Sequence, residues 1–451
     1  MRWINPIGLA LMVMLMLLHA LITTVDRRPY ASKDFYQQAK TEVAALNIDT
    51  ASAKDSLKVG FAKVNITPKR TLPLAGYGGR KPKTFEGIHD SIWVRTIVFD
   101  DGADKVAFVS ADLLIIHPSL ANRVYESLPV SWTRDQIYFA ATHTHSSVGG
   151  WAPGPVGDLF AGEYDVTAVE EIAEKIIESI EVAHNNSLSG AVSYNELQVP
   201  ELIYNRLVKD RGTTDPLMKI LGVKCGDLEG YLTVYSAHAT CLSRHYREVS
   251  GDFPGEFNRM LESKNEIDFS LYAAGPVGSM GNVTGDFPEN EQKEVDEMAT
   301  GLVGNLDLLR LLDPPYEAKV DLASFELTLP MRAPGLKVTG NLQLRHWLFE
   351  RLFGDYELWI KGMLLGNTLF LGLPFDFSGE LSSALYSVAE ANNLKLVITS
   401  FNGGYGGYVV KDEWYDLPKY ESRTMSWYGP DAGSYLSEII TLIIEKVADS
   451  K

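Results

Sequence analysis

The sequence predicts an α/β fold in which a mixed β-sheet core is flanked by helices. Strand-like and helix-like segments alternate from Val59 onward, which is typical of this fold class. At 451 residues the chain exceeds the usual size of one domain, roughly 100–200 residues, so its length allows one large domain or two. No internal repeat, low-complexity tract or long linker interrupts residues 58–450. We therefore expect a single large domain.

The predicted strands are short apolar runs, bounded by polar residues or glycine. In order along the chain they are residues 94–100, 105–111, 136–141, 191–198, 217–224, 231–237, 269–274, 318–329, 356–361, 368–373 and 395–401.

The clearest predicted helix covers residues 164–184. Apolar side chains recur there at the spacing of one helix face, at Val166, Val169, Ile172, Ile176, Ile177 and Ile180. Similar patterns predict helices over residues 288–312, 378–392 and 431–448.

The N-terminal segment reads as a membrane anchor or a signal sequence. The nineteen residues from Ile7 to Val25 carry no formal charge, and a membrane span needs about 20. No small-x-small cleavage site precedes Asp26, which favours an uncleaved signal anchor over a signal peptide. We therefore divide the chain into residues 1–28 (signal anchor or signal peptide), 29–57 (a linker with one amphipathic helix) and 58–451 (the large domain).

Composition limits the classes of partner. The chain is 45% hydrophobic, which is far too apolar for a disordered protein. Its formal charge is −17, which argues against nucleic acid or an anionic lipid surface as the main partner but leaves a neutral lipid substrate open. Cys225 and Cys241 fall on neighbouring predicted strands and could pair in an exported protein, or remain two buried thiols. Their spacing is not that of zinc ligands.

The tripeptide His143-Thr144-His145 follows directly after a predicted strand. Alternate residues of an extended segment point to the same side, so the two imidazoles are expected to lie together. Such a pair suits a metal, or one metal ligand beside one proton donor, and the alternative is two polar residues in a surface loop. Gly149 and Gly150 follow in a turn that lets a substrate approach the backbone, which favours a functional site.

Three further candidates also follow predicted strands, where functional loops of α/β sheets gather. His238 follows residues 231–237, Asp376 follows 368–373, and Tyr408 follows 395–401 across a glycine-rich segment. Taken singly, His238 reads as a hydrogen-bonded core histidine, Asp376 as a support for the helix capped by Ser378, and Tyr408 as packing. Together, two imidazoles, a carboxylate and a phenol would form a zinc site with room for a water.

With these motifs the chain resembles the neutral, non-lysosomal ceramidases, which are zinc amidases acting on N-acyl sphingosine. The most specific shared motifs are Thr-His-Thr-His-Ser at 142–146 and Tyr-Gly-Gly-Tyr at 405–408. The other matching segments, in the family's order, are residues 87–89, 94–95, 108–112, 204–206, 237–240, 250–252, 374–378, 413–415, 420–421 and 428–430.

The resemblance implies a role for each matching residue. The zinc ligands would be His143, His238, Asp376 and Tyr408. His145 would lie beside the metal-bound water or the substrate oxygen. An imidazole has an unperturbed pKa of about 6.5, so His145 is the expected proton source for the departing amine. The metal, with His145 or Tyr408 donating, would stabilise the oxyanion. The substrate-binding residues would be Arg206, Tyr420 and His89. The implied partner is a lipid-like N-acyl substrate, and the implied location is a membrane-anchored exported domain or a secreted, periplasmic protein.

Three departures from the family pattern mark a divergent, short relative. Asp376 stands where the family has glutamate, so the carboxylate is one methylene shorter. The family's serine, which lies in the site, is in a segment that appears here as residues 275–282, where Ser279 keeps the place of the serine and an aspartate is lost. Ser279 is therefore a catalytic candidate, as an alternative nucleophile to water, although the sequence assigns no Asp-His pair to it. We also expect the family's C-terminal immunoglobulin-like domain to be missing. Two rival interpretations therefore remain: a zinc hydrolase of another acyl amide or ester, and a membrane-tethered binding protein that has lost catalysis.

Overall fold

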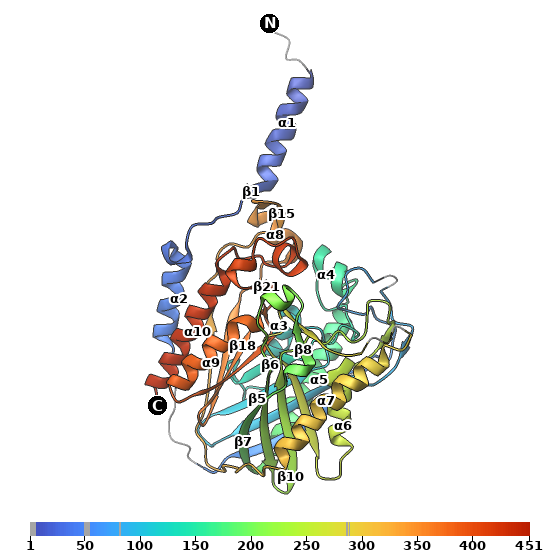
Figure 1. Ribbon diagram of the computed structural model, residues 1–451, viewed down its shortest axis with the longest axis vertical. Helices are drawn as coiled ribbons and strands as arrows, with labels where there is room; N and C mark the ends of the chain where they lie inside the picture. Colours follow the sequence, from blue (N-terminus) through green and yellow to red (C-terminus); the bar gives the residue numbers. More distant parts are fainter. Residues whose placement is uncertain (1–5, 49–54, 81–82, 286, 288) are drawn as a thin grey trace.

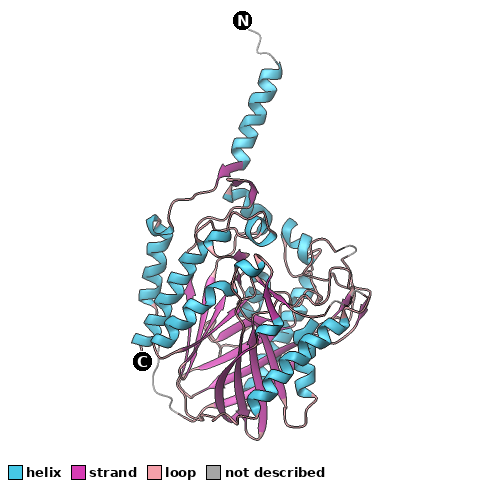
Figure 2. Cartoon of the chain, in the orientation of Figure 1, coloured by secondary structure: helices cyan, strands magenta, loops and turns pink. Residues whose placement is uncertain are grey.

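The computed structural model describes the chain apart from residues 1–5, 49–54, 81–82, 286 and 288. Its core is two packed β-sheets with helices on both outer faces (Figures 1 and 2). This mixed α/β architecture in one domain confirms the predicted fold class.

The larger sheet has eight strands, most of them antiparallel to their neighbours. Parallel pairs occur only at its two edges, between β12 and β10 and between β5 and β6. In sheet order the strands are β12 (Phe269–Ala274), β10 (Leu228–Tyr235), β9 (Leu217–Cys225), β7 (Leu188–Gln198), β2 (Lys58–Asn65), β4 (Trp93–Asp100), β5 (Lys105–Ala111) and β6 (Ile137–Ala141).

The second sheet has four strands and packs against one face of the first. In sheet order they are β14 (Leu322–Thr328), β17 (Trp359–Leu365), β18 (Thr368–Leu373) and β20 (Lys395–Ser400). Side chains alternate between faces along each strand. Phe108 of β5 accordingly packs with Phe370 of the second sheet, whereas its neighbour Val109 faces the helices on the other side. Because both faces of these sheets are covered, the sequences of their strands are continuous apolar runs.

Helices complete the outer layers. On the free face of the larger sheet lie α3 (Pro118–Ser127), α5 (Val166–Asn185), α6 (Asp252–Glu262) and α7 (Gln292–Arg310). The second sheet is covered by α2 (Asp34–Ala45), α9 (Ser382–Ala391) and α10 (Ala432–Asp449). Two short helices, α4 (Gly154–Ala161) and α8 (His346–Phe353), pack against each other.

The larger sheet curls until its two edges meet. The Ser110 hydroxyl of β5 donates to the Tyr272 carbonyl of β12 over 2.7 Å, and the Arg95 guanidinium of β4 donates to the Ser270 carbonyl over 2.8 Å. Adjacent strands twist by roughly 20–25° each, and this rotation accumulates across eight strands. The curl brings the carboxyl ends of β6 and β10, which lie far apart in sheet order, to one place.

The sequence located most of these elements and missed some. The predicted strands 105–111, 269–274 and 368–373 match the observed bounds of β5, β12 and β18. The helix predicted over 164–184 is observed as α5, which begins two residues later. The predicted helix over 288–312 is observed as α7, and its first residue lies outside the described part of the chain. The missed elements are the strand β2, the helices α3, α4, α6 and α8, and the strands of two or three residues outside the two large sheets.

The N-terminal region differs from the prediction. The apolar stretch is not one helix through Val25: α1 (Pro6–Leu21) has sixteen residues, and Ile22–Thr24 form strand β1, which pairs with β16 (Leu342–Leu344). Across the described part of the chain, no helix is both long enough and apolar enough to cross a membrane. The helix expected within 29–57 is α2, and residues 49–54 of that range lie outside the described residues.

Helix α2 is part of the domain core. Its side chains Tyr36, Ala39 and Val43 are buried in the cluster formed with α10 and the second sheet. The Tyr36 hydroxyl also donates to Glu438 of α10.

Replacing the fully buried Ala39 by Asp should lower the free energy of unfolding by at least about 2 kcal/mol, because a carboxyl group enters an apolar cluster with no partner. Gln37→Asp on the exposed face of the same helix is the control and should change it by less than about 0.5 kcal/mol. Urea unfolding of both variants measures the difference. Equal stabilities would mean that α2 does not pack on the domain in solution.

Candidate metal centre and substrate cavity

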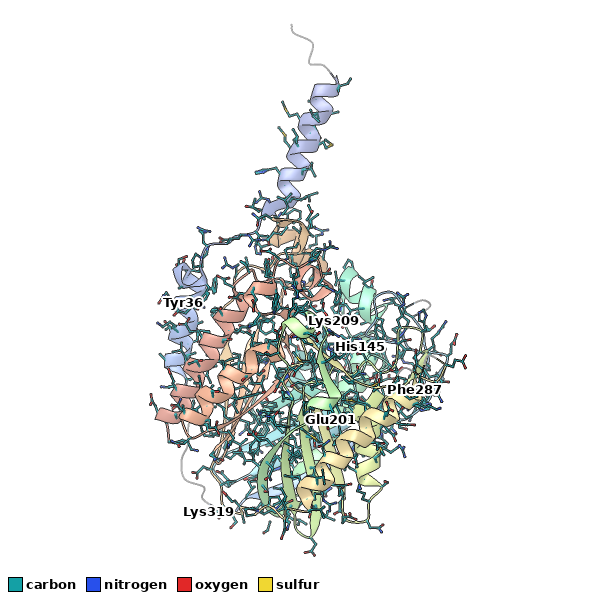
Figure 3. The ribbon with its side chains drawn as sticks, viewed as in Figure 1. Tyr36, His145, Glu201, Lys209, Phe287 and Lys319 are labelled. Atoms are coloured by element: carbon teal, nitrogen blue, oxygen red, sulfur yellow. The ribbon has the colours of Figure 1, made fainter. Side chains whose placement is uncertain are left out.

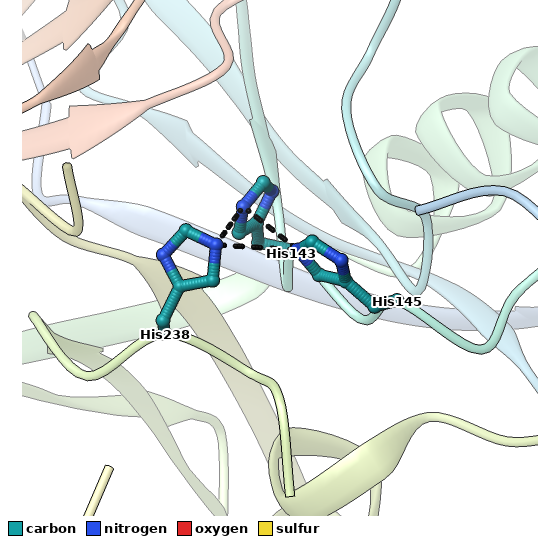
Figure 4. A group of neighbouring side chains, drawn as sticks. All are labelled: His143, His145 and His238. Atoms are coloured by element: carbon teal, nitrogen blue, oxygen red, sulfur yellow. Dashed lines mark hydrogen bonds between the residues drawn. The ribbon is translucent and has the colours of Figure 1, made fainter. Parts of the chain in front are cut away.

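Three histidine side chains converge at the carboxyl ends of β6 and β10 (Figure 4). The Nε2 atoms of His143 and His238 are 2.9 Å apart, and the Nε2 atom of His145 lies 3.3 Å from the first and 3.2 Å from the second. Within the described residues, this is the group of histidine, cysteine and carboxylate side chains whose ligand atoms lie close enough to hold a metal ion.

Backbone contacts fix the orientation of two rings. The Nδ1 atom of His143 lies 2.6 Å from the Leu114 carbonyl, and that of His238 lies 3.4 Å from the Val277 carbonyl. A carbonyl only accepts, so both Nδ1 atoms carry the proton and both Nε2 atoms carry a lone pair. A backbone φ of +63° at His143 and stacking of its ring on Phe401 further define the geometry.

This arrangement fits a bound cation. Lone pairs facing each other over 2.9 Å repel unless a proton or a metal lies among them. Burial lowers the pKa of His143 to about 3 and holds the pKa of His145 and of His238 well below the usual value, which disfavours the proton. Neutral imidazoles with free Nε2 atoms are the form that binds zinc.

His145 has a different environment from the other two. Its Nδ1 atom is buried without a hydrogen-bond partner among the described residues. Its ring lies 4.9 Å from that of Tyr77, and Gly76 approaches so closely that a Cβ there would be 2.7 Å from the His145 Cα. Figure 3 shows His145 toward the centre of the molecule.

Asp376 and Tyr408 enter the site from a separate pair of short strands. Asp376 on β19 (Asp376–Phe377) pairs in parallel with Tyr408 on β21 (Tyr408–Val409). The Oδ1 atom of Asp376 is 3.4 Å from the His143 Nε2 and has no hydrogen-bond donor, whereas Oδ2 accepts from the Tyr405 hydroxyl over 2.9 Å. Burial raises the pKa of Asp376 to about 7, so its carboxylate form also favours a nearby cation.

Arg206 connects Tyr408 to an acidic partner. Its guanidinium donates to the Tyr408 hydroxyl over 3.0 Å and forms an ion pair of 3.0 Å with Glu421. Burial raises the pKa of Tyr408 well above its ordinary value, so without a metal this side chain is a neutral phenol.

A cavity of about 810 Å³ opens over this group. The three histidines, Asp376, Tyr408, Arg206 and Tyr420 all line it. Most of the remaining wall is apolar and comes from several loops and helices: Leu114, Ile115, Val156, Leu159, Phe160, Leu336, Leu352, Phe353, Met425 and Trp427. The charged side chains of Arg244, Lys419 and Glu421 also line it. A largely apolar wall with a limited number of polar groups suits an amphipathic substrate.

Two predicted site residues lie outside this cavity. Ser279 is buried with its hydroxyl against that of Ser378, and it is not among the lining residues. His89 lies partly exposed, 3.8 Å from Glu248, also apart from the cavity. Cys225 and Cys241 are both free thiols, so the pairing considered from the sequence is not formed.

Sequence reasoning missed several contacts that shape the site. Tyr405, which holds Asp376, was visible only as part of a glycine-rich block. Phe401 under the His143 ring carries a φ of +69°, which no sequence pattern signals in a phenylalanine.

The similarity of the chain to known proteins agrees with the resemblance seen in its sequence motifs. A family model described as neutral/alkaline non-lysosomal ceramidase, N-terminal, matches residues 57–290, just over half of the chain. The chain is 25% identical over 246 residues to a neutral ceramidase from Pseudomonas aeruginosa, covering 50% of this chain and 37% of that protein. It is 24% identical over 225 residues to neutral ceramidase 1 from Arabidopsis thaliana, covering 45% and 29%. The match therefore spans about a third of the length of these curated relatives.

Solved structures show the same fold. The crystal structure of neutral ceramidase from Pseudomonas aeruginosa has a TM-score of 0.76 at 19% identity, covering 88% of this chain and 75% of that one. A structure described as ceramidase complexed with C2 has a TM-score of 0.75 at 18% identity, covering 87% and 75%.

Tyr405→Phe removes only the hydroxyl that orients Asp376, so the affinity of this candidate centre for added Zn²⁺ should fall by roughly 10–100-fold if the carboxylate takes part in binding. A competition titration with a chromogenic chelator measures this change. Tyr125→Phe is the matched control, because the Tyr125 hydroxyl is buried without a hydrogen-bond partner among the described residues. Equal affinity in both variants would show that Tyr405 does not position the carboxylate.

Proposed function

Because this chain belongs to the neutral/alkaline non-lysosomal ceramidase family, we propose that it is a zinc-dependent amide hydrolase acting on ceramide-like sphingolipids. It would cleave the N-acyl bond and release a fatty acid and an amine base. The observation that carries the proposal is the convergence of three neutral imidazoles at the polar end of an apolar cavity.

The proposed zinc ligands are His143, His238, Asp376 and Tyr408. The facing lone pairs of the two histidines and the undonated Oδ1 of Asp376 support this set. A bound zinc ion supplies Lewis acidity and lowers the pKa of a coordinated water toward neutrality. The Arg206 guanidinium favours the anionic form of Tyr408 by donating to its oxygen.

His145 is the proposed proton carrier. Its Nε2 atom faces the same point as those of His143 and His238. It would accept a proton from the attacking water and return it to the amine nitrogen as the carbon–nitrogen bond breaks. Once protonated, His145 would also donate to the negative charge that develops on the carbonyl oxygen, an effect worth roughly 3–4 kcal/mol in comparable oxyanion holes.

Water is the preferred nucleophile over Ser279. The hydroxyl of Ser279 forms a hydrogen bond with that of Ser378, and Ser279 is not among the residues that line the cavity. Arg206 and Tyr420 are proposed to bind the polar part of the substrate, since both line the cavity next to Tyr408. The apolar wall is proposed to hold the acyl or sphingoid chain.

We also propose that the domain is exported and that the N-terminal segment holds it at a membrane. The apolar composition of α1 supports attachment to a membrane. Comparing protease digestion of the domain in intact and lysed cells tests the orientation.

Two measurements separate the proposal from its rivals, which are a hydrolase of another acyl amide or ester and an inactive binding protein. Elemental analysis of purified protein, followed by a panel of N-acyl substrates, distinguishes all three.

Asp376→Asn should lower zinc affinity and reduce hydrolysis by orders of magnitude, because it removes the charge that offsets the dication while keeping the size of the side chain. Asp376→Glu restores the family's residue and should retain zinc. Inductively coupled plasma analysis and a fluorescent ceramide assay measure both. Full zinc content and activity in the asparagine variant would remove Asp376 from the site.

Arg206→Lys keeps the charge but not the fork that reaches both Tyr408 and Glu421, so kcat/KM should fall by roughly 10–100-fold. Lys209→Arg on the neighbouring exposed surface is the control and should leave the rate unchanged. An Arg206→Lys variant with full activity would show that one donor to Tyr408 is sufficient.

A further inference from the structure

The N-terminal helix is fixed to the same end of the molecule as the cavity. Helix α1 has no charged side chain, and its described large apolar side chains are exposed. It rises from that end beside β15 (Lys337–Thr339) and α8 (Figure 1). An apolar helix exposed in this way needs a nonpolar partner.

Hydrogen bonds join the base of α1 to the first turn of α8. The backbone amide of Arg345 donates to the Leu21 carbonyl over 2.9 Å, and its guanidinium donates to the His19 carbonyl over 2.8 Å. The Trp347 indole donates to the Ala20 carbonyl over 3.3 Å. Together with the β1–β16 pairing, these bonds set where α1 leaves the domain.

Helix α8 leads from this attachment to the cavity. It has eight residues and is therefore about 12 Å long, and Leu352 and Phe353 in its last turn line the cavity. On α4, which packs on α8, Leu159 lines the same cavity and is 57% exposed. The rim of the cavity thus lies about one α8 length from the base of α1.

Further apolar side chains are exposed between these points. Val338 on β15, Leu342 on β16 and Trp347 on α8 are 46%, 40% and 47% exposed. An exposed tryptophan with a hydrogen-bonded indole, beside an arginine and at the foot of an apolar helix, is typical of the boundary between lipid and water.

We propose that this face, made of α1, the β15–β16 hairpin, α8 and α4, docks on a lipid bilayer and opens the cavity onto the lipid surface. The inference rests on the proposed function, because it gives a water-insoluble N-acyl substrate a path from the bilayer into the cavity. With a formal charge of −17, the chain favours a zwitterionic surface over an anionic one.

Labelling tests the docking without any assay of activity. In the full chain, Val338→Cys and Leu342→Cys are labelled with the environment-sensitive dye NBD and mixed with phosphatidylcholine vesicles. Leu188→Cys and Leu228→Cys, at the hairpin end opposite α1, are the controls. The native cysteines are buried and should not react. The emission of the first pair should shift to the blue and that of the controls should not.

The same face should matter for catalysis only when the substrate is in a membrane. The variant Val338→Glu/Leu342→Glu/Trp347→Glu should hydrolyse a long-chain substrate in vesicles at least about tenfold more slowly than the native chain. Its rate on a water-soluble short-chain substrate should be unchanged, as should both rates in Leu188→Glu/Leu228→Glu.

The outcomes separate the two proposals. Blue shifts at the docking face without hydrolysis of any N-acyl substrate would overturn the proposed function and support the docking face. Hydrolysis with no shift, or with equal shifts at both ends, would overturn the docking face. Shifts that appear without vesicles and grow with protein concentration would also overturn it, since they would assign the face to a second copy of the chain.

Discussion

Three imidazole nitrogens face one another over 2.9 to 3.3 Å in a buried cavity. The site depends on a cation that would balance the lone pairs of these nitrogens. Without a cation, lone pairs oppose each other at short range. The fold holds the rings in place through carbonyls of Leu114 and Val277, through Phe401 and through a left-handed backbone at His143. Strained conformations of this kind persist where the surrounding structure requires them, as in functional sites.

The architecture supplies that rigidity because both faces of the main sheet are buried. The curl of the larger sheet brings β12 against β5, and the second sheet packs across the resulting concave face. Loops from β6, β10, β18 and β20 then meet at one end, each starting from a strand that cannot shift without disturbing a packed core. The apolar cavity wall comes from the loop after β5, from later loops and from α4 and α8. Leu114 contributes to both functions, since its side chain lines the cavity and its carbonyl orients His143.

The shorter carboxylate at position 376 has structural support in this chain. The β19–β21 pairing places Asp376 directly beside Tyr408, and Tyr405 holds one carboxylate oxygen so that the other faces His143. Gly278 packs so tightly that a Cβ there would lie 2.2 Å from the Asp376 carbonyl. The altered serine loop is therefore packed against the backbone of the proposed ligand.

The sequence by itself determined the fold class, most strands and the principal helices, because buried strands and amphipathic helices leave periodic apolar patterns. It also selected His143, His145, His238, Asp376 and Tyr408, which the structure brings to one cavity. The reason for the closeness of His143 and His145 was wrong: a φ of +63° interrupts the extended backbone, and tertiary packing aligns the rings. Only the tertiary structure decided the end of α1 at Leu21, the burial of Ser279 and the roles of Tyr405 and Glu421 as partners. Those features arise from contacts between residues that are distant in sequence, and a local sequence pattern does not encode such contacts.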